Sequence, residues 1–492
     1  MLPERLHSLY ANNPVLLLVV ICFLTVVLWI GAGEFYTKGE PREASVAASI
    51  LERGEWVLPE VYAGERAYKP PLTHWLTAVF STPCGKVSPF TSRLPSALAF
   101  TGMIVAVFLF YRRYYRKEVA FFTCIILLTC FELHRAAMTS RVDMTLTSLT
   151  VLAFILLFGW ERKQLKGFPM LIAIVMSGAT LTKGPVGIFL PMLVFGVYLL
   201  VLRYSLTRIV LKLLPVAVAS LVLPLVWYYF AYLEGGRPFL DLVWAENFGR
   251  LLGQKDLPVN YALGHEEGWW YNFLSLAAGF LPWTLLLFTS VKGLRNTTLS
   301  GVKERLIKIR SDRPMLFSLI AAVVTVGFYC IPLSKRSVYL MPAYPFIAVF
   351  ISGYVMGLRS GKTLLYRITA VYIVLWIAID AIALPIYKNS ITQKPFAEHI
   401  QRKYPALKQN IYAMNNLLEY SNMYGVNFYL GGSLRDFEKC RPDEGYLLVG
   451  GGSFERVAAV YGGSYLFERL ESYSNMCRDG EKEILLVSFG KK

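Results

Sequence analysis

The sequence predicts an α-helical, polytopic membrane protein of about 11–13 transmembrane helices with a small soluble α/β domain at its C-terminal end. Hydrophobic residues make up 55% of the 492 residues and charged residues only 17%. A soluble chain of this length needs far more charge to cover its surface. Apolar stretches of roughly 17–25 residues, the length that crosses a bilayer, recur over the first three quarters of the chain.

Eleven segments are expected to span the membrane. The first is read as a retained span, because no small-residue cleavage site follows it directly. Residues 70–84 are also apolar, but they are short and begin with a Pro pair, so we expect an interfacial or re-entrant helix there. The expected spans are residues 15–33, 93–111, 118–138, 143–160, 168–182, 184–202, 209–233, 269–292, 314–333, 336–357 and 364–386.

Basic residues predict the orientation. With the N-terminus in the cytoplasm, the Lys- and Arg-rich loops fall on the cytoplasmic side, as the positive-inside rule requires. Counting residues 70–84 as a crossing would place every later basic loop outside. The same placement accounts for the net charge of +17 without nucleic-acid binding. The cytoplasmic basic loops are residues 111–117, 161–166, 203–208, 292–313 and 359–367.

The chain divides into two expected domains. Residues 1–386 form the transmembrane domain, which includes outer loops at 33–95 and 234–268, and residues 387–492 form a periplasmic α/β domain. In the second domain, short runs with β character alternate with polar helical pieces and Gly-rich turns. Two cysteines lie there, Cys440 and Cys477, and their spacing leaves a disulfide between them open. The expected strands are residues 410–414, 426–430, 446–449 and 484–489.

Five cations break the positive-inside rule, because they lie on the predicted outer face close to membrane level. Ionisable groups at that depth are costly and need a partner or a function. Together they suggest a bound anion, and a lipid phosphate suits Lys as a point charge and Arg as a forked donor. The alternative is five independent headgroup contacts. The five cations are Arg42, Lys69, Lys183, Lys335 and Arg336.

Two acidic residues share this face and are the candidate catalytic groups. Glu40 opens an amphipathic segment and is followed by Pro41 in a first-turn position, which makes a simple capping role less apt. Asp143 stands where a span restarts, so it suits helix capping at least as well as catalysis. In a transfer reaction, a carboxylate orients or deprotonates the attacking oxygen while cations stabilise the departing phosphate.

Several short motifs occur in a familiar order over some 350 residues. Together they resemble the bacterial aminoarabinose (lipid A) transferases and the related dolichyl-phosphate-mannose–protein mannosyltransferases. Each motif alone is weak, and the C-terminal domain matches only in position and size. The motifs are GEPRE (39–43), GEW (54–56), YKPPL (68–72) with HW (74–75), SRLPS (92–96), VDM (142–144), LTKGP (181–185), ENFGR (246–250), GFLPW (279–283), LSKR (333–336) and YLMP (339–342).

The resemblance implies a GT-C-like fold, an undecaprenyl-phosphate sugar donor (dolichyl in eukaryotes) and a membrane cavity that opens to the periplasm. It places Glu40 at the essential acidic position of the first loop and Asp143 at a second acidic position. Arg42 and Lys69 match residues implicated in binding the carrier phosphate. The remaining conserved basic turns are occupied by Lys183, Lys335 and Arg336.

The sequence departs from the aminoarabinose branch at one position. That branch usually has an acidic residue, which helps to hold a metal, directly before the loop lysine, and this chain has Tyr68 there. His265 could supply one ligand to a divalent metal, with Glu266 or Glu267 nearby. One His and loosely placed carboxylates favour the alternative, an interfacial His265 without a metal. Glu43, Tyr68 and His265 remain candidates for lining the substrate.

The leading hypothesis is a glycosyltransferase of the bacterial inner membrane. It moves a sugar, with inversion, to an outer-leaflet acceptor such as lipid A, another envelope glycan or a protein Ser/Thr. A transporter or flippase of lipid-linked sugars is a second reading, but it predicts ionisable residues in mid-span and two related halves, which the sequence lacks. A polymerase or ligase that moves a whole glycan is a third, and only the ordered loop motifs argue against it.

Overall fold

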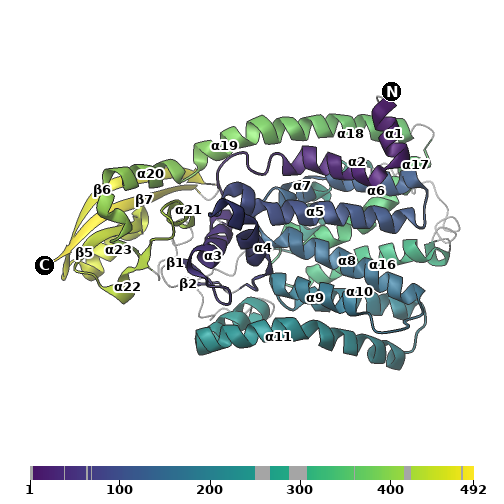
Figure 1. Cartoon of the computed structure of the whole chain (residues 1–492), viewed down its shortest axis with the longest axis horizontal. Helices are drawn as coiled ribbons and strands as arrows, with labels where there is room; N and C mark the ends of the chain where they lie inside the picture. Colours follow the sequence, from purple (N-terminus) through teal and green to yellow (C-terminus); the bar gives the residue numbers. More distant parts are fainter. Residues whose placement is uncertain are drawn as a thin grey trace.

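The computed structural model describes residues 4–37, 39–62, 65–67, 69–249, 266–286, 307, 309–358, 361–414, 423–477 and 480–492. Long apolar helices lie side by side in a bundle, and a C-terminal sheet with its helices lies beyond one end of that bundle (Figure 1). Between the two stand the short helices α3 (Gly39–Arg53) and α4 (Leu72–Ser81) and the hairpin β1 (Glu60–Tyr62) and β2 (Glu65–Arg66). This arrangement confirms the predicted fold class.

The apolar segments form helices. Within the described residues, six helices are long and apolar enough to cross a membrane, or seven if the bent pair α6–α7 is one span. Residues 72–81 form only a ten-residue helix, too short to cross, as expected for an interfacial or re-entrant segment. The bundle helices are α1 (Glu4–Asn12), α2 (Pro14–Cys22) with η1 (Phe23–Val27), α5 (Pro89–Arg112), α6 (Lys117–Thr129), α7 (Phe131–Ala137), α8 (Val142–Arg162), α9 (Met170–Lys183), α10 (Val186–Val201), α11 (Leu206–Trp244) with η3 (Ala245–Gly249), α13 (Trp270–Gly279), α16 (Arg313–Cys330), η4 (Ser337–Ala343) with α17 (Tyr344–Met356), and α18 (Gly361–Ala378) with η5 (Ile379–Ala383) and α19 (Leu384–Ile391).

Breaks in these helices set the positions of the residues at the ends of the bundle. Cys130 has an extended backbone (ψ 139°), and α6 and α7 meet there at a bend of 68°. Gly184 has a φ of +87°, a left-handed conformation that glycine adopts without strain, and it ends α9 directly after Lys183. The helices pack around one continuous core of buried aliphatic and aromatic side chains. The bundle therefore carries these loops at the end that faces the C-terminal domain (Figure 1).

The C-terminal domain is a five-stranded mixed sheet in the order β4-β3-β5-β7-β6. The strands β3 and β4 pair in parallel, as do β3 and β5, whereas β5 pairs with β7 and β7 with β6 in antiparallel fashion. This domain packs on the first outer loop, because Val46, Val61 and Ala67 share a core with residues of the sheet domain. Its elements are α20 (Lys394–Lys403), η6 (Pro405–Lys408), β3 (Ile411–Ala413), α21 (Tyr424–Tyr429), β4 (Arg435–Asp436), α22 (Phe437–Cys440), β5 (Glu444–Gly450), α23 (Gly451–Tyr461), β6 (Tyr465–Cys477) and β7 (Gly480–Lys491).

One expectation for this domain needs correction, and one open question about it is answered. Residues 426–430 were predicted as a strand, but they belong to α21 and the turn after it. A short apolar run does not distinguish strand from helix by periodicity, and here Phe428 packs edge-on against Phe35 of the first loop. The open question of a disulfide is also answered, since Cys440 is a free thiol. It follows β4 at one edge of the sheet, whereas Cys477 ends β6 at the opposite edge.

Candidate active site

The first outer loop brings α3 close to the start of α8. The Thr37 hydroxyl accepts a hydrogen bond from the Glu40 backbone N–H at 3.2 Å, which helps to start α3. Gly39 stands at the point of closest approach, because a Cβ built there would lie 2.7 Å from a guanidinium nitrogen of Arg141. A larger residue at position 39 would displace the Arg141 guanidinium from its place beside α3. The small residue therefore permits the contact between the two halves of the site.

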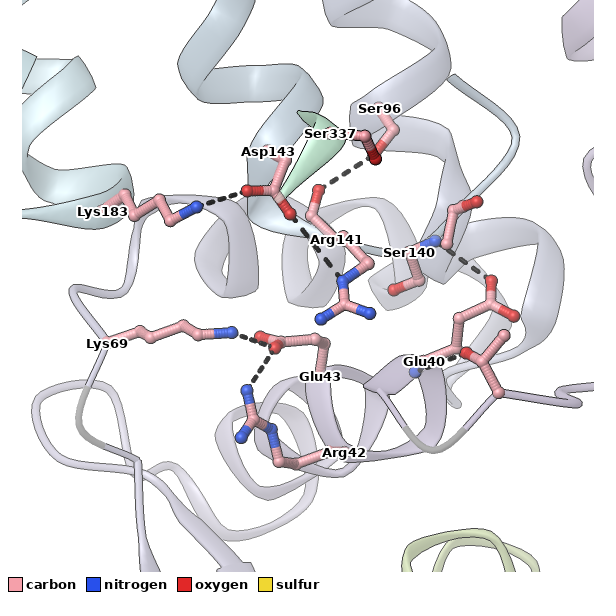
Figure 2. A network of polar contacts seen from close by, with 12 residues as sticks. Glu40, Arg42, Glu43, Lys69, Ser96, Ser140, Arg141, Asp143, Lys183 and Ser337 are labelled. Carbon is pink, nitrogen blue, oxygen red and sulfur yellow. Dashed lines mark hydrogen bonds and ion pairs between the residues drawn. The ribbon is translucent and has the colours of Figure 1, made fainter. Parts of the chain in front are cut away.

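Glu43, on the second turn of α3, is the centre of one half. Arg42 Nη2 donates to Glu43 Oε1 at 2.8 Å, and Lys69 Nζ pairs with the same oxygen (Figure 2). His74 Nε2, from α4, lies 2.7 Å from the other oxygen, Oε2. Burial opposes ionisation of Glu43, but the charges of Lys69 and Arg42 and the His74 hydrogen bond outweigh burial and hold the Glu43 pKa well below its usual range. Glu43 is thus a carboxylate with both oxygens engaged.

The surroundings of Lys69 disfavour its charged form. Burial, together with the positive charge of Arg42 and of Arg141, lowers the pKa of the Lys69 ammonium to about 7, although Glu43 acts to raise it. Glu43 alone does not offset the effect of burial and of the two guanidinium groups on the Lys69 pKa. A bound phosphate would supply that charge and restore an ordinary lysine pKa.

Asp143, in the first turn of α8, is the centre of the other half. Lys183 Nζ donates to Asp143 Oδ1 at 2.5 Å, and Arg141 Nε lies 3.8 Å from Oδ2. Lys183 comes from the last turn of α9, and its ammonium lies 4.2 Å from the centre of the Tyr339 ring. Among the residues with described contacts, the partners of the Asp143 carboxylate are these two cations, so it makes ion pairs rather than the helix cap that its position also allowed.

Arg141 joins the two halves. Figure 2 shows its guanidinium between Asp143 and Glu43, with Lys69 and Lys183 entering from the same side. Four cations, Arg42, Lys69, Arg141 and Lys183, therefore stand around two carboxylates, and with His74 neutral the group has a formal charge of 4 − 2 = +2. We refer to these six residues and His74 as the cation cluster. It is suited to bind an anion at the end of the bundle that faces the C-terminal domain.

Glu40 lies apart from this cluster in a buried ion pair. Arg93 Nε donates to Glu40 Oε1 at 2.7 Å, and the Ser140 backbone N–H donates to the same oxygen at 3.1 Å. Arg93 also donates to the carbonyl oxygens of Ile30, Gly33 and Glu34. Burial opposes ionisation of the Glu40 carboxyl, but the charge and hydrogen bond of Arg93 outweigh burial and lower the Glu40 pKa. Catalysis by Glu40 stays a prediction, but these contacts favour a structural role.

The other predicted residues lie away from the cluster or outside the described residues. Lys335 is buried, and its ammonium donates to the carbonyl oxygens of Glu267 and Pro332 at 2.9 and 2.8 Å. The Arg336 side chain has no hydrogen-bond or ion-pair partner within the part of the chain that the structure describes. Tyr68 and His265 lie outside the described residues. Neither Lys335 nor Arg336 therefore contacts Glu43 or Asp143.

The residues of the cluster do not fit a divalent metal. In the described ranges, no three His, Cys, Asp or Glu side chains gather in a way that could hold a metal ion. Glu43 is the only acidic side chain in its half of the cluster, and Arg42, Lys69 and His74 already occupy its two oxygens. A cation added there would meet positive charge. The metal that His265 could help to hold is left as a prediction from the sequence alone.

Sequence reasoning missed three residues of this region: Arg93, Arg141 and His74. Arg93 and His74 stood inside motifs given above without an assigned role, and Arg141 directly precedes the VDM motif. A signal was present for Arg93, because a charge inside an apolar span needs a buried partner. Arg93 is fully buried and pairs with Glu40, whereas His74 is 2% exposed and pairs with Glu43 only through Nε2, its Nδ1 having no hydrogen-bond partner among the described residues.

Comparison with known proteins gives this geometry a context. The family model described as dolichyl-phosphate-mannose-protein mannosyltransferase matches residues 68–229. An uncharacterized protein of Aquifex aeolicus is 28% identical over 384 residues, 77% of this chain and 71% of its own length. Two relatives described as undecaprenyl phosphate-alpha-4-amino-4-deoxy-L-arabinose arabinosyl transferases, from Shewanella sediminis and Proteus mirabilis, are 22% and 24% identical over 68% and 77% of this chain. The chain is therefore similar to proteins described as polyprenyl-phosphate glycosyltransferases.

This relationship extends to the fold. The crystal structure of ArnT from Cupriavidus metallidurans bound to undecaprenyl phosphate has a TM-score of 0.70 and 19% identity, covering 97% of this chain and 98% of that one. The oligosaccharyltransferase AglB of Archaeoglobus fulgidus has a TM-score of 0.52 and 12% identity, over 94% of this chain and 70% of that chain. At these identities the match shows a shared fold. The chain spans 59% of the Shewanella transferase and 66% of the Proteus transferase.

Proposed function

We propose that this protein transfers a sugar from a polyprenyl phosphate, such as undecaprenyl phosphate, to an acceptor in the outer leaflet. The observation that carries the proposal is the cation cluster, in which four cations surround only two carboxylates at the outer end of a membrane bundle. An excess of positive charge at membrane level suits a lipid-linked phosphate. The descriptions of the relatives point to the same class of donor.

The reaction is a displacement at the anomeric carbon of the donor sugar. The acceptor oxygen forms a bond to that carbon while the bond from carbon to phosphate oxygen breaks, and the electron pair stays on the phosphate. The acceptor proton passes to solvent or to a carboxylate, and the configuration inverts. Lys69 and Lys183 would stabilise the charge that develops on the phosphate, which therefore needs no protonation.

Within this scheme we assign the central carboxylate role to Glu43 and Asp143 rather than to Glu40. Glu43 and Asp143 hold the cations at fixed positions and face one another across Arg141 (Figure 2). Their ion pairs make them weak bases, so they would act chiefly by orienting the acceptor and the cations. The role of Glu40 is to fix the start of α3 through Arg93.

The related proteins and the apolar helices support a multi-pass inner-membrane protein of a bacterium. We further propose that the N-terminus is cytoplasmic and the C-terminal domain periplasmic, because the positive-inside rule favours that orientation. The acceptor, whether lipid A, another envelope glycan or a protein Ser/Thr, and the sugar it receives are to be identified by the deletion-strain measurement described next.

The test compares two glutamine variants in a transfer assay with a lipid-linked sugar donor. Glu43→Gln should retain or strengthen binding of the donor phosphate, because it removes a negative charge, while transfer falls by about a hundredfold or more. Glu40→Gln should instead lower the unfolding temperature. Transfer by Glu43→Gln at the wild-type rate would remove Glu43 from the site. Mass spectrometry of envelope lipids and glycans from a deletion strain would show which molecule loses one sugar.

A further inference from the structure

A cleft separate from the cation cluster lies between the first outer loop and the C-terminal domain. It consists of two adjoining cavities of about 500 and 450 Å³, which share Arg53, Lys408 and Gly432 in their walls. Each volume is typical of a site for a small ligand. One wall is α3 and the turn before α5, and the other is formed by α20, η6 and the residues from α21 to α22.

Positive charge in the cleft is less well paired than negative charge. Several of its charged residues satisfy one another: Lys394 pairs with Glu34 at 2.7 Å, and Arg53 lies 3.8 Å from Glu60. In contrast, the side chains of three cations have no ion-pair or hydrogen-bond partner among the described residues, and only one lining acid, Glu52, is in the same state. The three cations are Lys86, Lys408 and Arg435.

A buried hydroxyl in the wall of the larger cavity also lacks a partner. Ser45, on α3, is only 5% exposed, and within the described part of the chain its Oγ makes no hydrogen bond. Burying a hydroxyl without a partner costs free energy. Opposite it, Gly431 and Gly432 bring backbone without side chains to the cleft, and an added Cβ at either would meet nothing within 4 Å. The cleft therefore has free space beside the backbone of these two glycines.

The position of the cleft connects it to the membrane. Lys86, Val87, Ser88 and Pro89 line its inner end, and Pro89 begins α5, one of the helices long enough to span. Arg435 and Lys439 line its outer end in the C-terminal domain. A ligand anchored in the outer leaflet would reach Lys86 first and extend from there toward Arg435.

We propose that this cleft binds the phosphorylated glycan headgroup of a membrane-anchored acceptor. The unpaired cations would contact its phosphate groups, and the Ser45 hydroxyl and the backbone at Gly431 would contact sugar hydroxyls. The proposal rests on the proposed function, since it assigns the cleft to the acceptor of that reaction. The donor phosphate belongs to the cation cluster, which α3 presents on the side that carries Glu43.

The test measures binding without turnover. The full-length protein in nanodiscs is titrated with a soluble disaccharide bisphosphate, with the same disaccharide lacking phosphate, and with inorganic phosphate. The double variant Lys408→Glu/Arg435→Glu changes two exposed residues and should fold normally. Arg456→Glu is the matched control, because Arg456 is exposed on α23 and lines neither cavity. Lys69→Ala reports on the cation cluster.

The bisphosphate should bind the wild type and Arg456→Glu equally and the double variant about tenfold more weakly or worse. Lys69→Ala should bind it as the wild type does, and the unphosphorylated disaccharide and inorganic phosphate should bind far more weakly. Equal affinity in the double variant, or a loss in Lys69→Ala, would overturn the proposal, the latter by placing the ligand in the cation cluster. Because no sugar is transferred, a failure here is distinct from a failure of the transfer assay.

Discussion

The pKa of Lys69 leads to a specific prediction about donor binding. Burial and the neighbouring guanidinium groups of Arg42 and Arg141 lower it to about 7 in the protein without ligand. A bound phosphate would favour the ammonium and raise the pKa again. Binding therefore takes up a proton whenever Lys69 starts neutral. Donor affinity should be constant below pH 7 and should fall as the pH rises above it.

The size of the effect follows from linkage. Above pH 7, each pH unit should weaken binding by about tenfold, until the pKa of the bound state is reached. The sugar-linked donor is the right ligand, because its phosphodiester does not titrate in this range. The released polyprenyl phosphate has a second pKa near 6 and would mix its own titration with that of Lys69. Calorimetry in nanodiscs between pH 6 and pH 8.5 would give the affinities directly.

The matched control is Lys69→Arg. A guanidinium stays protonated throughout this range, so the affinity of this variant should not change with pH even if it differs from that of the wild type. Glu43 remains ionised throughout, because Lys69 and Arg42 hold its pKa well below its usual range, so it contributes no slope. A wild-type affinity that is flat between pH 7 and pH 8.5 would refute the reasoning, as would a slope of equal size in Lys69→Arg.

Two further predictions concern the surroundings of the cluster. Arg93→Met leaves the buried Glu40 carboxylate without its cation and should destabilise the protein by about 3–5 kcal/mol. Adding Glu40→Gln should recover part of this loss. Equal thermal unfolding of Arg93→Met and wild type in detergent would contradict the structural role. Lys183→Met removes the nearest cation from Asp143 and should weaken donor binding by about tenfold. Lys183→Arg should bind the donor more nearly as the wild type does. Unchanged donor binding in both variants would exclude Lys183 from the phosphate site.

Hydropathy and charge predicted the fold class because both act through simple averages along the chain. A bilayer requires apolar helices of a minimum length, and α5, α8 and α16 fall at segments predicted to span. The cations Arg42, Lys69 and Lys183 stood out because they lie where the positive-inside rule does not expect them. Burial makes such charges costly, and the structure shows that cost met by Glu43 and Asp143.

The partners of each charge could not be predicted in the same way. Glu40 and Glu43 are three residues apart on α3, and only the packing of that helix decides which one meets Arg93 and which meets Lys69. The Arg141 guanidinium reaches the site because Gly39, about a hundred residues away in the chain, has no side chain to displace it. Such pairings depend on tertiary contacts, which no local pattern of one sequence records.

Helix α3 explains why these features occur together. Its first turn is fixed to the bundle through Glu40 and Arg93, and its next turn carries Glu43 into the cation cluster. Its remaining turns, from Ser45 to Arg53, form a wall of the cleft against the C-terminal domain. Because one rigid helix contributes to both regions, an acceptor held in the cleft would lie in a fixed relation to a donor held by Lys69. The buried pair of Glu40 and Arg93 would then support transfer by fixing this geometry, without contacting either substrate.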